Sequence, residues 1–414
     1  MITLMQFFRE LKKEKTRILL TLFSIAWGTG SITFLLATGD GLMTSLRTSA
    51  EGLGKGMVVV WGGETTKVFK GLKTGRQIRL REEDVILLKE RVPEISRISP
   101  EYSNWGMRVD YGENSVNSQM HGVWPDFGPL RNVHPQRGGR FINKSDVDLR
   151  RRVIFIGDEV ETRLFENEEA VGKTIVINNV PFTVIGVMRS KVQSSSYSWM
   201  DKDKTFIPAS TFRVMFGNRY LNNLVYGPGV LTRSEEIKRR VFEILGGKHK
   251  FDSQDDSALW MWDTVEEDEI FGKIFIGVQT FFGIIGLLTL IVAGVGLANI
   301  MYAMVKNRTR EIGIKLAVGA KRRNIIGEYI LQSIITVFAG GVVGLAVTWV
   351  LISLIRIIPF EHEAFQYIAK PLPVMSLTTT VVVTLILGLV AFAAGIFPAR
   401  RAASINPAEA LRNE

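Results

Sequence analysis

Apolar residues without any charge gather in four blocks along the chain. The blocks cover residues 18–38, 274–305, 329–355 and 377–397. Each holds about 20 or more uncharged residues, and an α-helix of that length, rising ~1.5 Å per residue, crosses the ~30 Å hydrocarbon core of a bilayer. Because buried helices of soluble proteins are usually amphipathic and shorter, the pattern predicts four transmembrane helices. The second block is about ten residues longer than a span requires, and we interpret the surplus as a stalk outside the membrane.

The sequence between the first and second blocks alternates between strand and helix patterns. Short apolar runs predict strands near Met57 and at Val153–Ile156, and "KTIVINNVPFTVIGVM" predicts a hairpin that turns at its two asparagines. Helical spacing predicts helices over Arg81–Pro93, from Asp158 and from Ser234, the last with a serine cap and a glycine stop. The expected fold is a membrane protein with four transmembrane α-helices and a large mixed α+β extracytoplasmic domain between helices 1 and 2.

The net charge of +10 comes from basic residues that flank particular apolar blocks. They cluster before the first block, between the second and third, and after the fourth, whereas the acidic cluster Asp263–Glu269 precedes the second block. Since basic loops stay in the cytoplasm, both termini are expected on the cytoplasmic side. The charge is therefore a topology signal, and without a basic face carrying interleaved aromatics it does not indicate nucleic-acid binding.

The first block is either a retained anchor or a cleaved signal peptide. Its apolar run is longer than the usual ~7–15 residues of a signal peptide, and "LATGDG" is a poor cleavage site. A retained anchor gives an even number of helices, which puts every basic loop on one side, so we expect the anchor.

These patterns divide the chain into consecutive segments. They are a cytoplasmic amphipathic N-terminal helix (1–17), transmembrane helix 1 (18–38), the extracytoplasmic core domain (39–272), a stalk with transmembrane helix 2 (273–305), a cytoplasmic loop (306–328), transmembrane helix 3 (329–355), a short extracytoplasmic loop (356–376), transmembrane helix 4 (377–397) and a cytoplasmic tail (398–414). The chain has no cysteine, which suits an exported domain.

Sequence signals for catalysis are weak. "AVGKTIVI" contains Gly-Lys-Thr, but a phosphate-binding loop needs a glycine where Asn167 stands and a helix where a strand is predicted. The four histidines lack metal-ligand spacing, and "EHE" at Glu361–Glu363 is interpreted as an exposed polar loop. No serine lies in a nucleophile-elbow sequence. We therefore predict no catalytic and no metal-binding residues, and we do not expect an enzyme.

Aromatic residues mark two further segments. The segment Ser190–Lys204 is predicted to be a flexible polar loop, and its exposed apolar residues are Tyr197, Trp199 and Met200. It is either a mobile surface loop or a contact for cargo or an adaptor protein, because amphipathic aromatic residues favour interfaces. "ALWMWDT", with Trp260 and Trp262, is interpreted as an aromatic anchor at the membrane interface.

The basic loop between the second and third blocks contains a short helical pattern. Ile312, Leu316 and Gly319 share one helical face, and Gly319 with Ala320 permits a close turn before a triplet of basic residues. A stop-transfer segment would explain the basic residues, but it would not explain an apolar stripe on a short helix that faces water. Such a stripe requires a partner.

The C-terminal tail is also predicted to be ordered. Pro398 is expected to end the fourth transmembrane helix, and a second short helix follows. Asn406 suits its cap, Pro407 its first position and Glu409 a box-like N-x-x-E. Its small apolar side consists of Ala408 and Leu411. The tail is therefore expected to fold against a cytoplasmic surface.

Two cytoplasmic segments, "REIGIKLAVGAKRRNI" and "FPARRAASINPAEALRNE", resemble the signatures of MacB/FtsX-type ABC transporter permeases. Three outer segments, "RRVIFIGDEVETRLF", "AVGKTIVINNVPFTVIGVM" and "TFIPASTF", resemble the MacB-like periplasmic core, and the order agrees over nearly the whole chain. The resemblance implies a multi-pass protein of the bacterial cytoplasmic (inner) membrane. Two permeases, as a homodimer or a paralogous heterodimer, would pair above two copies of an ABC ATPase subunit, with membrane lipid around them and an extracytoplasmic adaptor protein as a further candidate partner.

The resemblance also implies roles for particular residues. The loop helix of this family is the coupling helix on the ATPase, so that role falls on Glu311, Ile312, Gly313, Lys315, Gly319 and Ala320. A tail-docking role falls on Arg400, Arg401, Pro407, Ala408 and Leu411. The chain itself would carry no cofactor, because the partner ATPase binds ATP and Mg. The implied function is a permease subunit that couples ATP hydrolysis to extracytoplasmic conformational change driving export or efflux, a mechanism termed mechanotransmission.

The sequence departs from the family pattern in three respects. Only residues 1–17 precede the first membrane block, so the ATPase is expected on a separate polypeptide. Gln332 stands where many members have an acidic residue. The outer region is larger than in the cell-division members, which favours the exporter branch. Two alternatives share the architecture: a transducer that moves no cargo and regulates an outer-face partner, and a permease that extracts lipoproteins.

Overall fold

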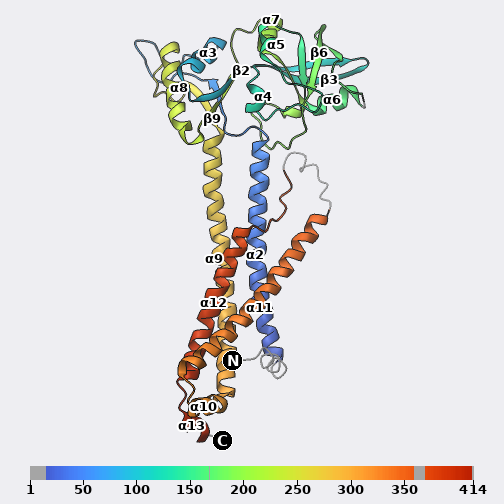
Figure 1. Cartoon of the computed structure of the whole chain (residues 1–414). Helices are drawn as coiled ribbons and strands as arrows, with labels where there is room; N and C mark the ends of the chain where they lie inside the picture. The colour runs from blue at the N-terminus through green and yellow to red at the C-terminus, as the bar shows by residue number, and fades with distance from the viewer. Residues whose placement is uncertain (1–14, 167, 359–368, 413–414) are drawn as a thin grey trace. The chain divides into compact units, whose positions relative to one another are not determined.

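The computed structural model describes residues 15–166, 168–358 and 369–412, which form two compact units (Figure 1). The helical unit contains residues 15–45, 273–358 and 370–412, and the sheet unit contains the described part of residues 46–272 together with Ala369. Two predictions lie outside the described residues: the first fourteen residues of the amphipathic N-terminal helix, and the "EHE" loop.

Four long helices dominate the helical unit. They are α2 (Lys15–Glu51), α9 (Thr264–Asn307), α11 (Arg322–Ile357) and α12 (Leu377–Ala403). Among the described residues, these are the helices that are long and apolar enough to cross a membrane, and each contains one of the predicted blocks. The fold class predicted from hydropathy is thereby confirmed.

Small residues let these helices approach one another closely. A Cβ atom placed on Gly340 would lie 2.8 Å from the side chain of Ile25, and one placed on Gly344 would lie 2.5 Å from the carbonyl oxygen of Ala26, so this GxxxG pair packs within the chain against α2. Gly395 likewise faces Ser333, whose hydroxyl donates to the carbonyl of Ala391 at 2.7 Å. Such glycines permit backbone contact between membrane helices.

Two short helices complete the helical unit: α10 (Thr309–Ala317) and α13 (Pro407–Arg412). The helix at Pro407 begins as predicted, and Asn406 Oδ1 accepts the backbone N–H of Ala408 at 3.1 Å. The prediction for Pro398 is wrong, because this proline lies inside α12, which continues to Ala403. Pro398 is buried with the alanines that follow it, and neighbouring helices in a membrane bundle compensate for the hydrogen bond that a proline removes.

The sheet unit is built on one mixed nine-stranded sheet, in the order β3-β7-β4-β6-β5-β2-β8-β1-β9. The strands are β1 (Val58–Gly62), β2 (Ile95–Tyr111), β3 (Asn114–Val123), β4 (Val153–Ile156), β5 (Thr174–Ile177), β6 (Val180–Val187), β7 (Lys204–Pro208), β8 (Asn223–Pro228) and β9 (Leu259–Asp263). The pairs β3–β7 and β4–β6 are parallel, and the other pairs are antiparallel.

Both faces of this sheet are buried. Along β1, Val58 and Val60 belong to one apolar core while Val59 belongs to the other, and successive side chains of a strand point to opposite faces. The helices of this unit are α3 (Glu82–Arg91), α4 (Phe127–Leu130), α5 (Lys144–Asp148), α6 (Asp158–Phe165), α7 (Ala209–Phe216) and α8 (Ser234–His249). The α+β domain between the first two membrane helices is therefore confirmed.

Several local predictions for the sheet unit are confirmed and one is wrong. The strands at Met57 and Val153 form, and so does the β5–β6 hairpin, where Asn178 (φ 49°) and Asn179 (φ 62°) take the left-handed conformation of a two-residue turn. For α8, the predicted serine cap and the predicted glycine stop are both wrong. Ser234 is inside the helix and donates to Asp263 at 2.6 Å, and the helix continues past its glycines to a left-handed Lys250.

Candidate functional site

The short helix α10 lies between α9 and α11 and is held by tight connections at both ends. At its start, the Thr309 hydroxyl donates to the carbonyl of Lys306 at 2.9 Å, and the Ile312 N–H donates to the carbonyl of Arg308 at 3.0 Å. Arg308 alone separates α9 from α10. The two helices are therefore joined by a very short link.

At its other end, α10 closes with a glycine in the left-handed region. Gly319 has φ +96°, its N–H donates to Leu316 O at 3.1 Å, and the Ala320 N–H donates to Lys315 O at 3.0 Å. These two bonds form a Schellman cap, which requires the positive φ that glycine adopts without strain. A Cβ atom placed on Gly319 would meet nothing within 4 Å, so the turn opens to its surroundings.

One face of α10 is covered by the chain itself. Ile312 and Gly313 are buried, and a Cβ atom placed on Gly313 would lie 2.6 Å from that of Ala410 in α13. Helices α10 and α13 lie side by side at the C-terminal end of the chain (Figure 1). Along the predicted stripe, Ile312 is buried, Leu316 is half-buried and Gly319 is exposed. The expectation that this stripe meets a partner stays a prediction.

The opposite face of α10 exposes apolar side chains that the sequence reading did not single out. Ile314 is 46% exposed and Val318 is 84% exposed, and their i, i+4 spacing puts them on one side of the helix. Glu311, Lys315 and Gly319 are also exposed. The same helical periodicity could have found this second stripe, since Ile314 and Val318 follow Ile312 and Leu316 by two residues.

Basic residues lie on α10 and in the neighbouring elements of the helical unit. Lys315 is paired with Glu328 of α11 at 2.9 Å, which fixes α10 against the start of the third membrane helix. Exposed basic residues follow α10 directly at the start of α11, and others lie at the end of α12: Lys321, Arg322, Arg323, Arg400 and Arg401. We call the exposed face of α10 with its Gly319 turn the coupling surface.

The remaining tail residues are placed as follows. Pro407 is half-buried, whereas Ala408 is exposed, so the apolar side of α13 is formed by Ala410 and not by Ala408. The reason is geometric, because Ala410 is the position that faces Gly313. The side chain of Leu411 lies outside the described part of the structure.

The segment Ser190–Lys204 is more ordered than its composition predicts. Trp199 is 53% exposed and packs edge-on against Trp105 with ring centroids 6.1 Å apart, while Met200 is half-buried. Tyr197 is not exposed as expected: its ring packs against Trp61 and Trp262, and its hydroxyl donates to Glu101 at 2.5 Å. Trp105, which no local signal marked, completes the exposed pair.

Tyr197 is held over a buried ionic cluster. Asp201 accepts from Arg131 at 2.7 Å, from Lys191 at 2.8 Å and from Lys204 at 2.9 Å, and all four side chains are buried or nearly so. Burial alone raises the pKa of Asp201, but the three positive charges outweigh it and hold the pKa well below its ordinary value. These ion pairs therefore hold the segment Ser190–Lys204 against Arg131.

Glu101 forms the second acidic centre of this cluster. Its carboxylate lies 2.6 Å from His121 Nδ1 and accepts from Asn223 at 2.5 Å. Burial raises the pKa of Glu101, but the hydrogen bond with His121 and the charges of Arg131 and Lys204 lower it to about 2. These contacts join residues of β2, β3 and β8, and β8 is far from the other two strands in sequence.

Two tryptophans interpreted as a membrane-interface anchor belong to the sheet. Trp260 and Trp262 lie on β9, directly opposite Trp61 and Val59 of β1. Together with Tyr197 they line a shallow aromatic groove on this unit. Within the described residues, no group of three or more His, Cys, Asp or Glu side chains is placed to hold a metal ion.

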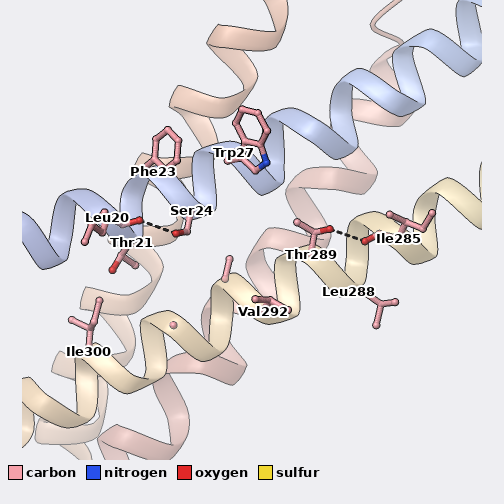
Figure 2. Close-up of a pocket in the computed structure, with 12 residues that line it drawn as sticks. Leu20, Thr21, Phe23, Ser24, Trp27, Ile285, Leu288, Thr289, Val292 and Ile300 are labelled. Atoms are coloured by element: carbon pink, nitrogen blue, oxygen red, sulfur yellow. Dashed lines mark hydrogen bonds between the residues drawn. The ribbon is translucent and has the colours of Figure 1, made fainter.

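A second apolar groove runs along α2 and α9 of the helical unit (Figure 2). Its exposed side chains include Phe23 and Trp27 from α2 and Leu288 and Val292 from α9. Phe23 and Trp27 stack with ring centroids 6.2 Å apart. The Ser24 and Thr289 hydroxyls in the groove donate to backbone carbonyls of their own helices, so the groove offers an apolar surface suited to lipid or another helix.

Comparison with known proteins identifies two families. Residues 18–236 match the family model described as the MacB-like periplasmic core domain, and residues 283–407 match the FtsX-like permease C-terminal model. Together they cover the sheet unit as far as the start of α8 and most of the four long helices, and β9 lies between the two matched ranges.

Curated relatives match nearly the whole chain. Proteins named "Macrolide export ATP-binding/permease protein MacB" from Bdellovibrio bacteriovorus and Wolinella succinogenes are each 28% identical, over 99% and 98% of this chain. The matches cover 61% and 60% of those proteins, so the chain spans about three fifths of the length of the curated relatives it matches.

Solved structures of extracytoplasmic domains also match. The periplasmic region of MacB from Actinobacillus actinomycetemcomitans aligns with a TM-score of 0.42 and 20% identity, covering 54% of this chain and 94% of that one. The extracellular domain of the noncanonic ABC-type transporter YknZ from Gram-positive bacteria aligns with a TM-score of 0.41 and 15% identity, covering 50% and 100%.

Proposed function

The chain belongs to the family of the MacB-like periplasmic core domain, joined here to an FtsX-like permease domain, and from this premise we propose that it is the permease subunit of an ABC-type transporter. Four apolar helices with an α+β domain between the first two suit a bacterial inner-membrane protein. In the proposed orientation the coupling surface and both termini are cytoplasmic and the sheet unit is periplasmic.

We propose that an ABC ATPase docks on the coupling surface. The observation that carries this proposal is the exposure of Ile314 and Val318 on a helix that is capped by Gly319 and supported from behind by α13. An amphipathic helix presents such i, i+4 side chains to a groove in its partner. The exposed basic residues that follow α10 at the start of α11 would add electrostatic steering.

ATP-driven movement would then pass outward along α9. This helix has 44 residues without a break, which makes a rod of ~65 Å at ~1.5 Å per residue. It starts at the residue after β9 ends, and it is joined to α10 through Arg308. The ATPase supplies the chemistry with ATP and Mg, while this chain carries the displacement to the sheet unit, where cargo or an adaptor protein is engaged.

A second permease copy is proposed to pack on the groove of Figure 2. Stacked Phe23 and Trp27 and the exposed Leu288 and Val292 offer a continuous apolar surface for a partner helix. Pairing would bring two coupling surfaces over two ATPase subunits. The names of the relatives lead us to propose export or efflux as the transport direction, with the macrolide class as the first cargo to assay.

The proposal is tested by placing a charge on the coupling surface. Ile314→Asp and Val318→Asp should each reduce co-purification of the ABC ATPase and its stimulation by the permease, because a carboxylate cannot be buried in an apolar groove without a partner. Leu149→Asp is the matched control, since Leu149 is an exposed apolar residue of the sheet unit. Unchanged association in both α10 variants, at normal expression, would exclude this docking surface.

A further inference from the structure

The segment that leads into α12 crosses α2 at a glycine. A Cβ atom placed on Gly41 would lie 2.1 Å from the carbonyl oxygen of Leu372 and 3.0 Å from the Cα of Pro373. The N–H of Val374 also donates to the carbonyl of Ala37 at 2.9 Å. The two backbones are therefore in direct contact, and only glycine leaves room for it.

Asp40, the residue before this glycine, joins three helices. Its Oδ1 accepts from Gln279 Nε2 of α9 at 2.6 Å, and its Oδ2 accepts from Thr379 Oγ1 of α12 at 2.9 Å. Thr379 is itself fixed, because its N–H donates to the cap residue Ser376 at 3.0 Å. The carboxylate thus bridges α2, α9 and α12 through side chains that are already oriented.

The third membrane helix, α11, also contacts the segment that leads into α12. Arg356, at the end of α11, donates from Nη2 to the carbonyl of Pro373 at 3.2 Å. Asp40 and Arg356 closely follow the apolar blocks 18–38 and 329–355, so both polar contacts lie at the ends of the predicted spans. We call Ala37, Asp40, Gly41 and residues 370–379, with Gln279 and Arg356, the Gly41 joint.

We propose that Asp40 and Gly41 are positioning residues that clamp α2 to the N-terminal end of α12, so that these helices move as one body. This inference rests on the proposed function, because it gives a displacement of α10 a second route outward, through α11 and α12 to α2. Besides the joint, α2 is held to α11 by close packing at Gly340 and Gly344 and by the Thr348 hydroxyl, which donates to the carbonyl of Gly30 at 3.1 Å. The joint adds a direct link from α2 to α12. With it, α2 and α9 both receive the displacement.

The joint can be measured without nucleotide or cargo. The chain has no cysteine, so Leu42→Cys on α2 and Leu377→Cys on α12, both exposed positions, can carry nitroxide labels in the full chain in lipid nanodiscs. Pulsed electron paramagnetic resonance then gives the distance distribution across the joint. The parent is expected to show a single narrow distribution.

Two matched pairs of variants separate the joint from general helix effects. Gly41→Ala forces a Cβ against Leu372, whereas Gly39→Ala adds the same methyl group to the same helix and meets only Phe275 at 3.8 Å. Asp40→Leu removes both hydrogen bonds, whereas Asp40→Asn keeps an oxygen that accepts from Gln279 and an amide that donates to the Thr379 hydroxyl.

The narrow distribution should persist in Gly39→Ala and Asp40→Asn and be lost in Gly41→Ala and Asp40→Leu. The inference is overturned if Gly41→Ala matches Gly39→Ala, or if the parent distance changes when the ABC ATPase is trapped with ATP and vanadate. A nitroxide label at Val318 whose signal does not change on trapping would count against the proposed function. The comparison of the variants without nucleotide would still test whether the Gly41 joint clamps α2 to α12.

Discussion

At the scale of single residues, three buried cations meet on one carboxylate. Arg131, Lys191 and Lys204 all donate to Asp201, and Tyr197 lies over the Arg131 guanidinium with 4.5 Å from its central carbon to the ring centroid. Burying an ion pair brings little net stability, yet removing one partner leaves the others uncompensated. The cluster therefore fixes the position of the loop more than it adds stability, and the exposed Trp199 depends on that position.

Asp201→Asn should destabilise the sheet unit by about 3–5 kcal/mol, because it leaves three buried cations without their counter-charge. Unfolding of the full chain in detergent, followed by tryptophan fluorescence, measures the loss. Asp110→Asn is the control, since it breaks only the exposed pair with Arg108 and should cost less than about 1 kcal/mol. Equal effects of the two substitutions would show that the cluster does not hold the loop.

The lowered pKa of Glu101 predicts how the free energy of unfolding depends on pH. Its pKa is lowered from 4.5 to about 2 in the folded chain, so its contribution to the free energy of unfolding is complete above pH 4.5 and is lost as the pH falls from 4.5 to about 2. The shift corresponds to about 3 kcal/mol. Thermal unfolding midpoints of the parent should fall through this window, and those of Glu101→Gln should fall less. Parallel curves for the two proteins would contradict the assignment.

At the scale of elements, α10 has a covered and an exposed side. The tail helix covers Gly313 through Ala410, the salt bridge from Lys315 to Glu328 fixes α10 to α11, and Ile314 and Val318 remain exposed. In the proposed mechanism, a helix held on one side in this way would transmit a displacement without bending. The cap at Gly319 sets where this helix ends.

Gly319→Trp should weaken binding of the ABC ATPase, because the indole occupies the open space beside the turn. Any L-residue at φ +96° is also strained, at a cost of about 1–3 kcal/mol. Gly319→Ala carries the same strain without the bulk and is therefore the control. ATPase co-purification should drop far more for tryptophan than for alanine, and an equal drop would mean that the cap, and not close approach, matters.

Local signals explain which elements the sequence could predict. The β5–β6 hairpin turns at Asn178 and Asn179 because these residues tolerate left-handed conformations, and the long helices follow from the thickness of a bilayer. The ends of α8 and α12 were misplaced because Ser234 bonds to Asp263 and Pro398 is accommodated by neighbouring helices. Both depend on residues distant in sequence.

In the candidate site, too, some features follow from local sequence and others depend on how distant elements pack. The loop helix and its glycine turn were found from spacing alone, but which face of α10 is free depends on where α13 packs. The sequence predicts a stripe that begins at Ile312, which is buried in the structure, whereas Ile314 and Val318 are exposed. The cluster under Tyr197 could not be found, because it joins Glu101, Arg131 and Asp201 from separate elements.

At the scale of the whole molecule, the proposed mechanism requires the sheet unit and the coupling surface to lie on opposite sides of the membrane. Cysteine placed at Leu149, 65% exposed on the sheet unit, should react with a membrane-impermeant reagent from the outside of intact cells. Cysteine placed at Val318 should react only after the cells are opened. Labelling of both from the same side would refute the topology.

The most direct test of the central claim is a photo-reactive amino acid at Val318, in membranes that contain the chain and its ABC ATPase. We predict a cross-link between Val318 and the ATPase, and none from the same amino acid at Leu149. If the probe at Val318 captures no ATPase while the two proteins co-purify, the ATPase binds elsewhere, and α10 is not the element that couples ATP hydrolysis to this permease.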